Sequence, residues 1–334
     1  MNMKQWLNEL LTAPRKKAMP VLSFPSISLL DVTVRELIAD PKLQAEGMAR
    51  IAARTPSAAS VSMMDLSVEA EAFGCQIRLS DDEVPTVIGT LVHDEDEANG
   101  LAVPEVGAAR TGRYIQAIAL ACEKITDRPV LAGVIGPFSL AGRLMDVSEA
   151  MVNCLVEPDM VHVLMNKTTD FLIKYILEYK KAGANGVVLA EPLTGLLSPD
   201  LAGEFSAPYV RRLAQAVQDD SFIVVYHNCG DNTILMIDSI LDTNCACYHF
   251  GNAISMKEML KHIPKDIIAM GNVDPASQFK NGTPESIRED TLRVMKECCP
   301  DYPNFVISSG CDIPPLSGWE NIDAFFRAVD EYYA

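Results

Sequence analysis

The sequence contains no apolar run of the ~20 residues that a membrane-spanning helix needs. Its first residues, MNMKQWLNELLTAPRKK, are amphipathic and lack the apolar core of a signal peptide. Positive charge is scarce, since 28 Lys and Arg stand against 45 Asp and Glu, which gives a net charge of −17. That field would repel a polyanion, so the composition argues against a nucleic-acid partner. We therefore expect a cytoplasmic protein that has neither a membrane nor a nucleic-acid partner.

Motifs for nucleotide cofactors and for disulfide frameworks are missing as well. No GxGxxG or P-loop follows an early strand, which weakens the case for a nucleotide-binding open sheet. The nine cysteines are an odd number, form no CxxC pair, and show no spacing typical of disulfides. Free thiols and metal binding are therefore the expected uses of cysteine in this chain.

Eight short apolar segments alternate with helical patterns along the chain. Each segment is a near-continuous apolar run, which is typical of strands that are buried on both faces. The segments are residues 19–24, 58–65, 129–136, 186–191, 222–227, 245–250, 266–272 and 304–310. Eight strands that alternate with helices predict an α/β protein with a (β/α)8 TIM barrel, and a doubly wound open sheet is the alternative.

No low-complexity linker or change of composition divides the chain, so we predict one TIM-barrel domain over residues 1–334. The amphipathic first residues predict an N-terminal helical extension of this barrel. Residues 66–128 are too long for a single helix, which predicts an insertion after the second strand.

Chemically reactive side chains gather at the carboxyl ends of the predicted strands, where TIM-barrel enzymes place their active sites. The residues of this kind are Asp65, Glu191, His227, Cys229, His249 and Cys311. The amino-terminal ends of the same segments are mostly plain polar residues or prolines. This asymmetry predicts an active site at the carboxyl-terminal mouth of the barrel.

One imidazole and two thiolates make a ligand set that suits Zn²⁺. His227 and Cys229 end the fifth segment and Cys311 follows the eighth, so all three face the same mouth in a barrel. Three protein ligands leave a fourth position free, as catalytic zinc requires. On spacing alone the alternative stays open, because a buried cysteine is more often a small apolar core residue.

The sequence resembles the uroporphyrinogen decarboxylase superfamily, and within it the methylcobamide:thiol methyltransferase branch. The segments that carry the resemblance extend over nearly the whole chain: MDLSVEAEAFG (64–74), GPFSLAGRL (136–144), LAEPLTGLLSP (189–199), HNCGD (227–231), GNVDP (271–275) and SSGCDIPP (308–315). The resemblance implies a (β/α)8 barrel and a His-x-Cys zinc motif with a second Cys far downstream. That motif maps onto His227, Cys229 and Cys311.

The decarboxylase branch itself fits less well. Those enzymes carry an Arg-rich segment like MRQAGR after the first strand, whereas MPVLSFPSISLLD has no arginine here. A polycarboxylate porphyrinogen without nearby guanidinium groups would be poorly paired. Asp65 matches the position of an aspartate of that branch, but it lacks those arginines.

The resemblance implies a zinc-dependent methyltransferase that moves a methyl group between a corrinoid and a small substrate such as a thiol. The alternatives are a methyltransferase that takes the methyl group from a methyl ether or methylamine to cob(I)amide, and a uroporphyrinogen decarboxylase. No DxHxxG segment of a cobalamin-binding domain occurs. The corrinoid is therefore expected as a co-substrate, either free methylcobalamin or a group carried by a separate corrinoid protein.

Three further residues are candidates for the same site. We predict Glu191 as a displaceable fourth zinc ligand, and a carboxylate pairing inside the barrel mouth is the alternative. His249 could orient a ligand or the substrate, with a hydrogen-bonded polar histidine of the rim as the alternative. Asp65 is predicted to position the substrate or a water molecule.

Overall fold

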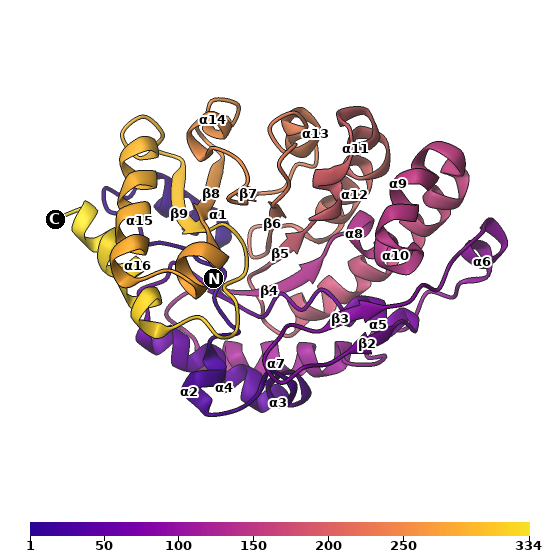
Figure 1. Cartoon of the computed structure of the whole chain (residues 1–334), viewed down its shortest axis with the longest axis horizontal. Coiled ribbons are helices and arrows are strands. Elements are labelled where there is room, and N and C mark those ends of the chain that lie inside the picture. Colours follow the sequence, from indigo (N-terminus) through magenta and orange to yellow (C-terminus); the bar gives the residue numbers. More distant parts are fainter.

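The protein, described here over residues 1–334 by a computed structural model, is built on one curled sheet of seven parallel strands. The strands lie in the order β1 (Ser60–Val61), β4 (Val130–Ile135), β5 (Gly186–Ala190), β6 (Ile223–Asn228), β7 (Cys247–Phe250), β8 (Ile268–Val273) and β9 (Phe305–Ser309). Figure 1 looks onto the arc of strands with helices arranged around its outside. This arrangement confirms the predicted α/β barrel.

Burial on both faces explains why the strand segments are apolar throughout. In β5 and β6, Val188 and Val225 belong to a cluster of 18 buried residues that fills the barrel. Their neighbours Val187 and Val224 point the other way, into the larger cluster of 80 residues between sheet and helices. Successive side chains alternate between these two cores, so most positions on both faces of a strand are apolar.

The first predicted strand, residues 19–24, is not a strand in the structure, and this part of the prediction is wrong. The segment nevertheless fills the eighth position of the barrel. Met19 N donates to Ile307 O of β9 over 3.0 Å, and Ala58 N, just before β1, donates to Ala18 O over 2.8 Å. Pro20 has no N–H group to donate, which limits the ladder that this segment can form.

Helices cover the outside of the sheet, as Figure 1 shows. The outer helices are α4 (Pro41–Arg54), α7 (Thr111–Lys124), α10 (Pro158–Lys181), α12 (Ala207–Val217), α13 (Ile237–Leu241), α14 (Met256–Leu260), α15 (Pro284–Cys298) and α16 (Trp319–Tyr332). Shorter helices are α2 (Ser26–Leu30), α3 (Val34–Ala39), α8 (Pro137–Met145), α9 (Val147–Val156), η1 (Leu193–Leu196), α11 (Pro199–Phe205) and η2 (Pro275–Lys280). None of them combines the length and apolar composition that crossing a bilayer requires.

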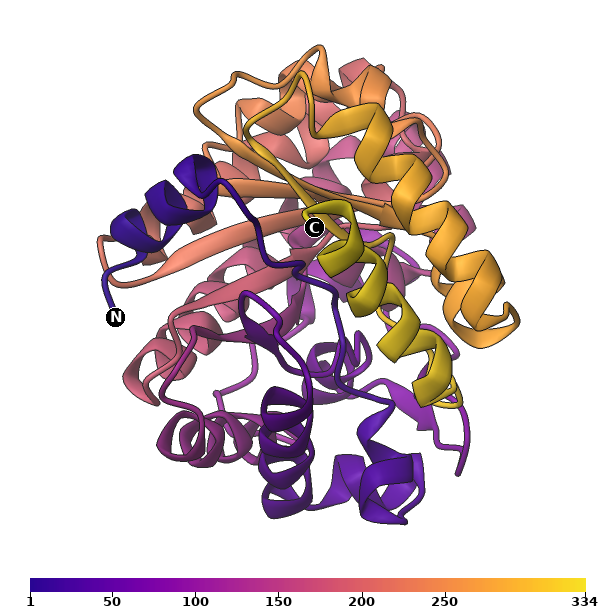
Figure 2. The same ribbon diagram turned by 90° about the vertical axis from the view of Figure 1, so that its left-hand side faces the viewer.

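Helix α1 (Met3–Thr12) is the predicted N-terminal extension, and it covers the amino-terminal end of the barrel. Met3 N donates to Asp220 O over 2.7 Å, and Trp6 Nε1 donates to Ala58 O over 3.3 Å. The buried side chains of Met3, Trp6 and Leu10 join the cluster inside the barrel. Figure 2 shows α1, in indigo, beside one end of the strands.

Residues 66–128 form an insertion after β1, as predicted. It contains α5 (Val68–Phe73), the antiparallel pair β2 (Gln76–Arg78) and β3 (Thr86–Ile88), α6 (Glu95–Gly100) and finally α7. In Figure 1 the β2–β3 hairpin and α6 extend away from the barrel.

Candidate metal centre

Three metal-ligating side chains meet at the carboxyl-terminal mouth of the barrel. His227 is the next-to-last residue of β6, Cys229 directly follows that strand, and Cys311 follows β9. One ligand atom from each of the three residues lies within 4.8 Å of the other two. The structure thus brings together the three residues that the sequence motif singled out.

Close backbone packing holds Cys229 in place. Strand β6 ends with Asn228, whose Oδ1 accepts hydrogen bonds from Gly230 N at 2.9 Å and Thr233 Oγ1 at 3.1 Å in the loop that follows. Gly251, which follows β7, lies directly against the cysteine. A Cβ atom at position 251 would be 2.5 Å from Cys229 Cα, so only glycine allows this approach.

The loop that carries Cys311 is fixed from two sides. Gly310 N donates to Val273 O of β8 over 2.6 Å, which continues the pairing of β8 with β9. On the other side, Asp312 Oδ2 accepts a hydrogen bond from Met64 N over 3.3 Å. Cys311 is therefore held between the end of β8 and the chain that follows β1.

The two thiols perturb each other strongly. The hydrogen bond from Cys311 has the largest effect on the pKa of the Cys229 thiol, and together with the nearby His227 ring it lowers that pKa to about 4. The same hydrogen bond between the sulfurs, together with burial, raises the pKa of Cys311 well above its ordinary value. The two close sulfurs thus share one proton. A divalent cation that binds both sulfurs can take the place of that proton.

His227 presents a ring nitrogen that has no protein partner. The side chain is buried, with 3% of its surface exposed, and its Nε2 atom accepts or donates no hydrogen bond. Its other nitrogen, Nδ1, lies 2.7 Å from Nδ1 of His249. A buried polar atom without a partner costs free energy, so Nε2 is the atom expected to bind a metal ion.

Glu191 lies outside this group of donor atoms. Its carboxylate accepts hydrogen bonds from Phe138 N and Ser139 N at 2.9 Å each and from Ser139 Oγ at 2.7 Å. It therefore caps the amino terminus of α8, a position that favours a negative charge. Its full burial raises its pKa to about 7. This arrangement matches the alternative interpretation, a carboxylate paired inside the mouth.

Asp65 pairs with a buried arginine that no sequence pattern predicts beside it. Its Oδ2 pairs with Arg110 Nη1 and accepts a hydrogen bond from Tyr114 Oη at 2.6 Å. Its Oδ1 accepts from Ser67 Oγ at 2.6 Å. The pair ties α7 of the insertion to the end of β1, and its side chains are 6% and 0% exposed, which leaves them little contact with solvent.

Two more buried carboxyl groups near the mouth were not predicted. Burial raises the pKa of Glu69 to about 7 and that of Asp312 to about 8. Each has one oxygen without a hydrogen-bond partner. Glu69 lies in the MDLSVEAEAFG segment, and Asp312 follows Cys311 in the SSGCDIPP segment at the end of the eighth predicted strand.

Cysteines outside the metal centre have thiol pKa values that are raised and not lowered. Burial raises the pKa of Cys75 and Cys154 to about 11 and that of Cys245 to about 12. Such thiols stay protonated at neutral pH and behave as small apolar side chains. Among the thiols, Cys229 alone has a lowered pKa, which distinguishes it from the core cysteines.

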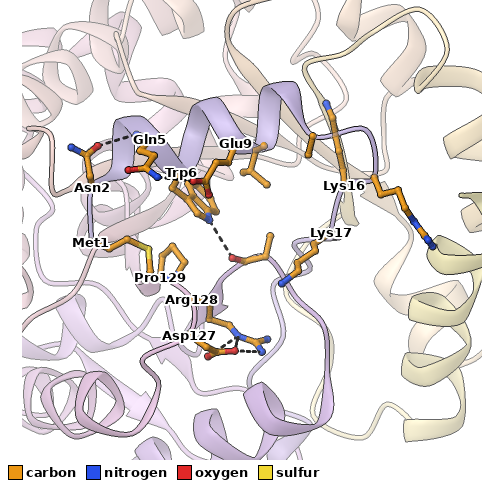
Figure 3. Close-up of a pocket in the computed structure, with 14 residues that line it drawn as sticks. Met1, Asn2, Gln5, Trp6, Glu9, Lys16, Lys17, Asp127, Arg128 and Pro129 are labelled. Carbon is orange, nitrogen blue, oxygen red and sulfur yellow. Dashed lines mark hydrogen bonds and ion pairs between the residues drawn. The ribbon is translucent and has the colours of Figure 1, made fainter.

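A cavity of about 410 Å³ lies at the other end of the barrel, beneath α1 (Figure 3). Its lining includes Trp6, Glu9, Lys17, Asp127 and Arg128, and no histidine or cysteine. The dashed lines in Figure 3 show that Trp6 and Arg128 already have protein partners there. This cavity is therefore separate from the metal centre.

Comparisons with known proteins agree with the fold. The profile of the family described as uroporphyrinogen decarboxylase (URO-D) matches residues 17–332. Methylcobamide:CoM methyltransferase MtbA of Methanosarcina acetivorans is 26% identical over 273 residues, which cover 80% of this chain and 78% of that protein. Uroporphyrinogen decarboxylase of Chlorobium limicola is 26% identical over 250 residues, which cover 72% and 69%.

A solved structure of a methyltransferase from Methanosarcina mazei superposes with a TM-score of 0.87 and covers 100% of both chains. Its sequence is 24% identical, so this likeness describes the fold alone.

Proposed function

The chain belongs to the uroporphyrinogen decarboxylase family, and we propose that within it the protein is a zinc-dependent corrinoid methyltransferase. It would move a methyl group between a corrinoid and a small substrate such as a thiol. The observation that carries this proposal is the group of His227, Cys229 and Cys311 at the barrel mouth, with donor atoms within 4.8 Å of one another.

The residues present fit a zinc ion. An unpartnered Nε2 on His227 and two close sulfurs that compete for one proton supply one neutral and two anionic ligands. Two thiolates balance the charge of a divalent ion, and three protein ligands leave a position for the substrate. A decarboxylase of a porphyrinogen would have no use for such a set.

A zinc ion held there would supply positive charge that favours the thiolate form of a substrate thiol. The substrate sulfur would attack the methyl carbon of a methylcorrinoid as the cobalt–carbon bond breaks. Both electrons of that bond stay on cobalt, which becomes Co(I), and the thiol proton is released to solvent. In the reverse direction, cob(I)amide would take the methyl group from a methyl ether or a methylamine.

The other predicted site residues take supporting roles in this proposal. Glu191 holds the start of α8 against the end of β5, and its service as a fourth zinc ligand stays a prediction. Asp65 and Arg110 fasten the insertion to the rim of the barrel. His249 contacts His227 from the neighbouring strand.

Exposed apolar side chains at the mouth are consistent with a separate corrinoid protein as partner. Most of the large apolar residues that are exposed lie in segments that follow barrel strands: Val152, Leu155, Val156, Leu196, Leu235 and Leu316. Where such side chains form a contiguous exposed patch, they mark sites of protein interaction. Relatives named for methylcobamide support a corrinoid as co-substrate. The cytoplasmic location stays a prediction, with which nine free cysteines agree.

The decisive experiment combines metal analysis with an anaerobic methyl-transfer assay. We expect stoichiometric zinc in the purified protein and conversion of methylcobalamin to cob(I)alamin, followed by absorbance, when a thiol such as coenzyme M is added. Candidate methyl donors incubated with cob(I)alamin test the reverse direction. A protein that binds no zinc, or that binds zinc but supports neither direction, would contradict the proposal.

A matched pair of variants identifies the ligands. Cys311→Ser should lose zinc and activity together, because a hydroxyl is a poor replacement for a thiolate ligand. Cys245→Ser changes a buried cysteine outside the centre and should retain zinc. Full zinc content and full rate in Cys311→Ser would remove Cys311 from the site.

A further inference from the structure

A chain of buried hydrogen bonds leads from the metal centre to the segment that closes the barrel. His227 Nδ1 lies 2.7 Å from His249 Nδ1, and His249 Nε2 lies 2.7 Å from Ser308 Oγ. Ser308 Oγ in turn donates to Met19 O over 2.7 Å. His249 and Ser308 are 0% exposed, so no solvent competes for these contacts.

The direction of each bond follows from the last one. Met19 O is a carbonyl and can only accept, so the single proton of the Ser308 hydroxyl is committed to it. Ser308 Oγ must then accept from His249, which places a proton on His249 Nε2. In the neutral ring His249 Nδ1 is consequently an acceptor, and His227 must carry its proton on Nδ1.

We infer that His249 and Ser308 are positioning residues that hold His227 in the tautomer with a bare Nε2, ready to bind the metal ion. Two observations meet in this inference. The chain of bonds requires a bare Nε2, and Nε2 is the one polar atom of His227 that has no protein partner. A neutral histidine in water favours the opposite tautomer. This hydrogen-bond relay from Met19 O, together with the backbone carbonyl oxygen of His249 at 3.3 Å from His227 Nδ1, supplies what the ring alone would not.

The relay also connects the metal centre to closure of the barrel. Met19 belongs to the segment that bridges β9 and β1, since Met19 N donates to Ile307 O. The neighbouring Ser309 contacts the same segment, because its Oγ accepts from Val21 N over 3.0 Å. The hydroxyl of Ser309 makes no hydrogen bond with a histidine ring, which makes Ser309 a matched control for Ser308.

The test compares Ser308→Ala, Ser309→Ala and His249→Phe with the wild-type protein. Zinc affinity is measured by competition with a chelator, and folding is checked by the midpoint of urea denaturation. We expect Ser308→Ala and His249→Phe to lower zinc affinity about 10–100-fold, as loss of a partner behind a metal-bound histidine usually does. Ser309→Ala loosens the same segment but should leave zinc affinity within about twofold of wild type.

A second measurement reads the tautomer directly in the metal-free protein. The chain has 5 histidines, so spectra of ¹⁵N-histidine-labelled protein can be assigned by single substitutions. Wild type should show His227 protonated on Nδ1 and bare on Nε2, and Ser308→Ala should mix the two tautomers. An Nε2 proton on His227 in wild type, or equal zinc loss in the two serine variants, would overturn the inference.

The inference uses the zinc site of the proposed function, but the two fail separately. A wild-type protein without zinc affinity contradicts the proposed function, and the tautomer measurement still tests the relay. A wild-type protein that binds zinc and keeps its affinity in His249→Phe contradicts the relay alone.

Discussion

Replacing Gly251 by alanine should displace Cys229 and weaken zinc binding, although position 251 carries no ligand. The added Cβ would lie 2.5 Å from Cys229 Cα and 2.6 Å from Cys229 Cβ. Carbon atoms that are not bonded prefer separations of about 3.5–4.0 Å, so the two loops must separate by roughly 1 Å. Neither contact is with the flexible end of a side chain that could turn away.

The size of the effect follows from the tolerance of metal sites. Metal–ligand distances in working sites stay within about 0.2 Å of their ideal values, so a displacement of roughly 1 Å is several times too large. The loop has limited freedom to adjust, because Asn272 Nδ2 donates to Gly251 O over 2.9 Å. We expect zinc affinity to fall at least about tenfold and the free energy of unfolding to fall by about 1–3 kcal/mol.

The assay is chelator competition for zinc, measured alongside urea denaturation of the metal-free protein. Gly100→Ala is the control, because this helical glycine of α6 is exposed and has nothing within 4 Å of the added Cβ. It should leave zinc affinity unchanged. If Gly251→Ala binds zinc as tightly as Gly100→Ala does, then the backbone of this loop does not position Cys229 and our reasoning about the centre is wrong.

Two further predictions concern the buried charges near the mouth. Burial raises the pKa of Glu69 from 4.5 to about 7, so the folded state holds the proton more tightly than the unfolded chain does. The free energy of unfolding should therefore fall by about 3 kcal/mol as the pH rises from the unfolded pKa to the folded pKa. Glu69→Gln should remove that part of the pH dependence in urea denaturation at pH 5 and pH 8, and an unchanged slope would contradict the assignment. Arg110→Met leaves Asp65 buried without its cation and should cost about 3–5 kcal/mol, whereas adding Asp65→Asn should restore part of this loss; a double variant no more stable than Arg110→Met would argue against the pair.

The metal ligands could be predicted from the sequence because the order of residues alone locates the strand ends and gives the spacing of the motif. Apolar runs locate the strands, and their carboxyl ends share one face in a parallel barrel. His227, Cys229 and Cys311 therefore had to face one mouth once the barrel was assumed. The same logic located His249 and Asp65 near the rim, but it could not say which groups they contact.

Contacts between distant segments could not be predicted from the sequence, because they depend on the path of the folded chain. Arg110 reaches Asp65 only because the insertion turns back over the end of β1, and no local pattern encodes that path. The orientation of the His249 ring depends on a hydroxyl from β9 and a carbonyl from residue 19. Residues 19–24 looked like a strand because their apolar pattern fits a barrel position, while their backbone makes few ladder bonds there.

The curvature of the sheet itself assembles the metal centre. From β6 to β9 the chain crosses three strand spacings, and in a flat sheet these ends would lie about 14 Å apart, since neighbouring strands are separated by about 4.8 Å. The three donor atoms nevertheless lie within 4.8 Å of one another. Only a sheet that curls, with loops that lean inward, can bring them together. A metal ion that binds this set therefore binds the closed barrel and not the unfolded chain, and it must stabilise the fold in proportion to its affinity.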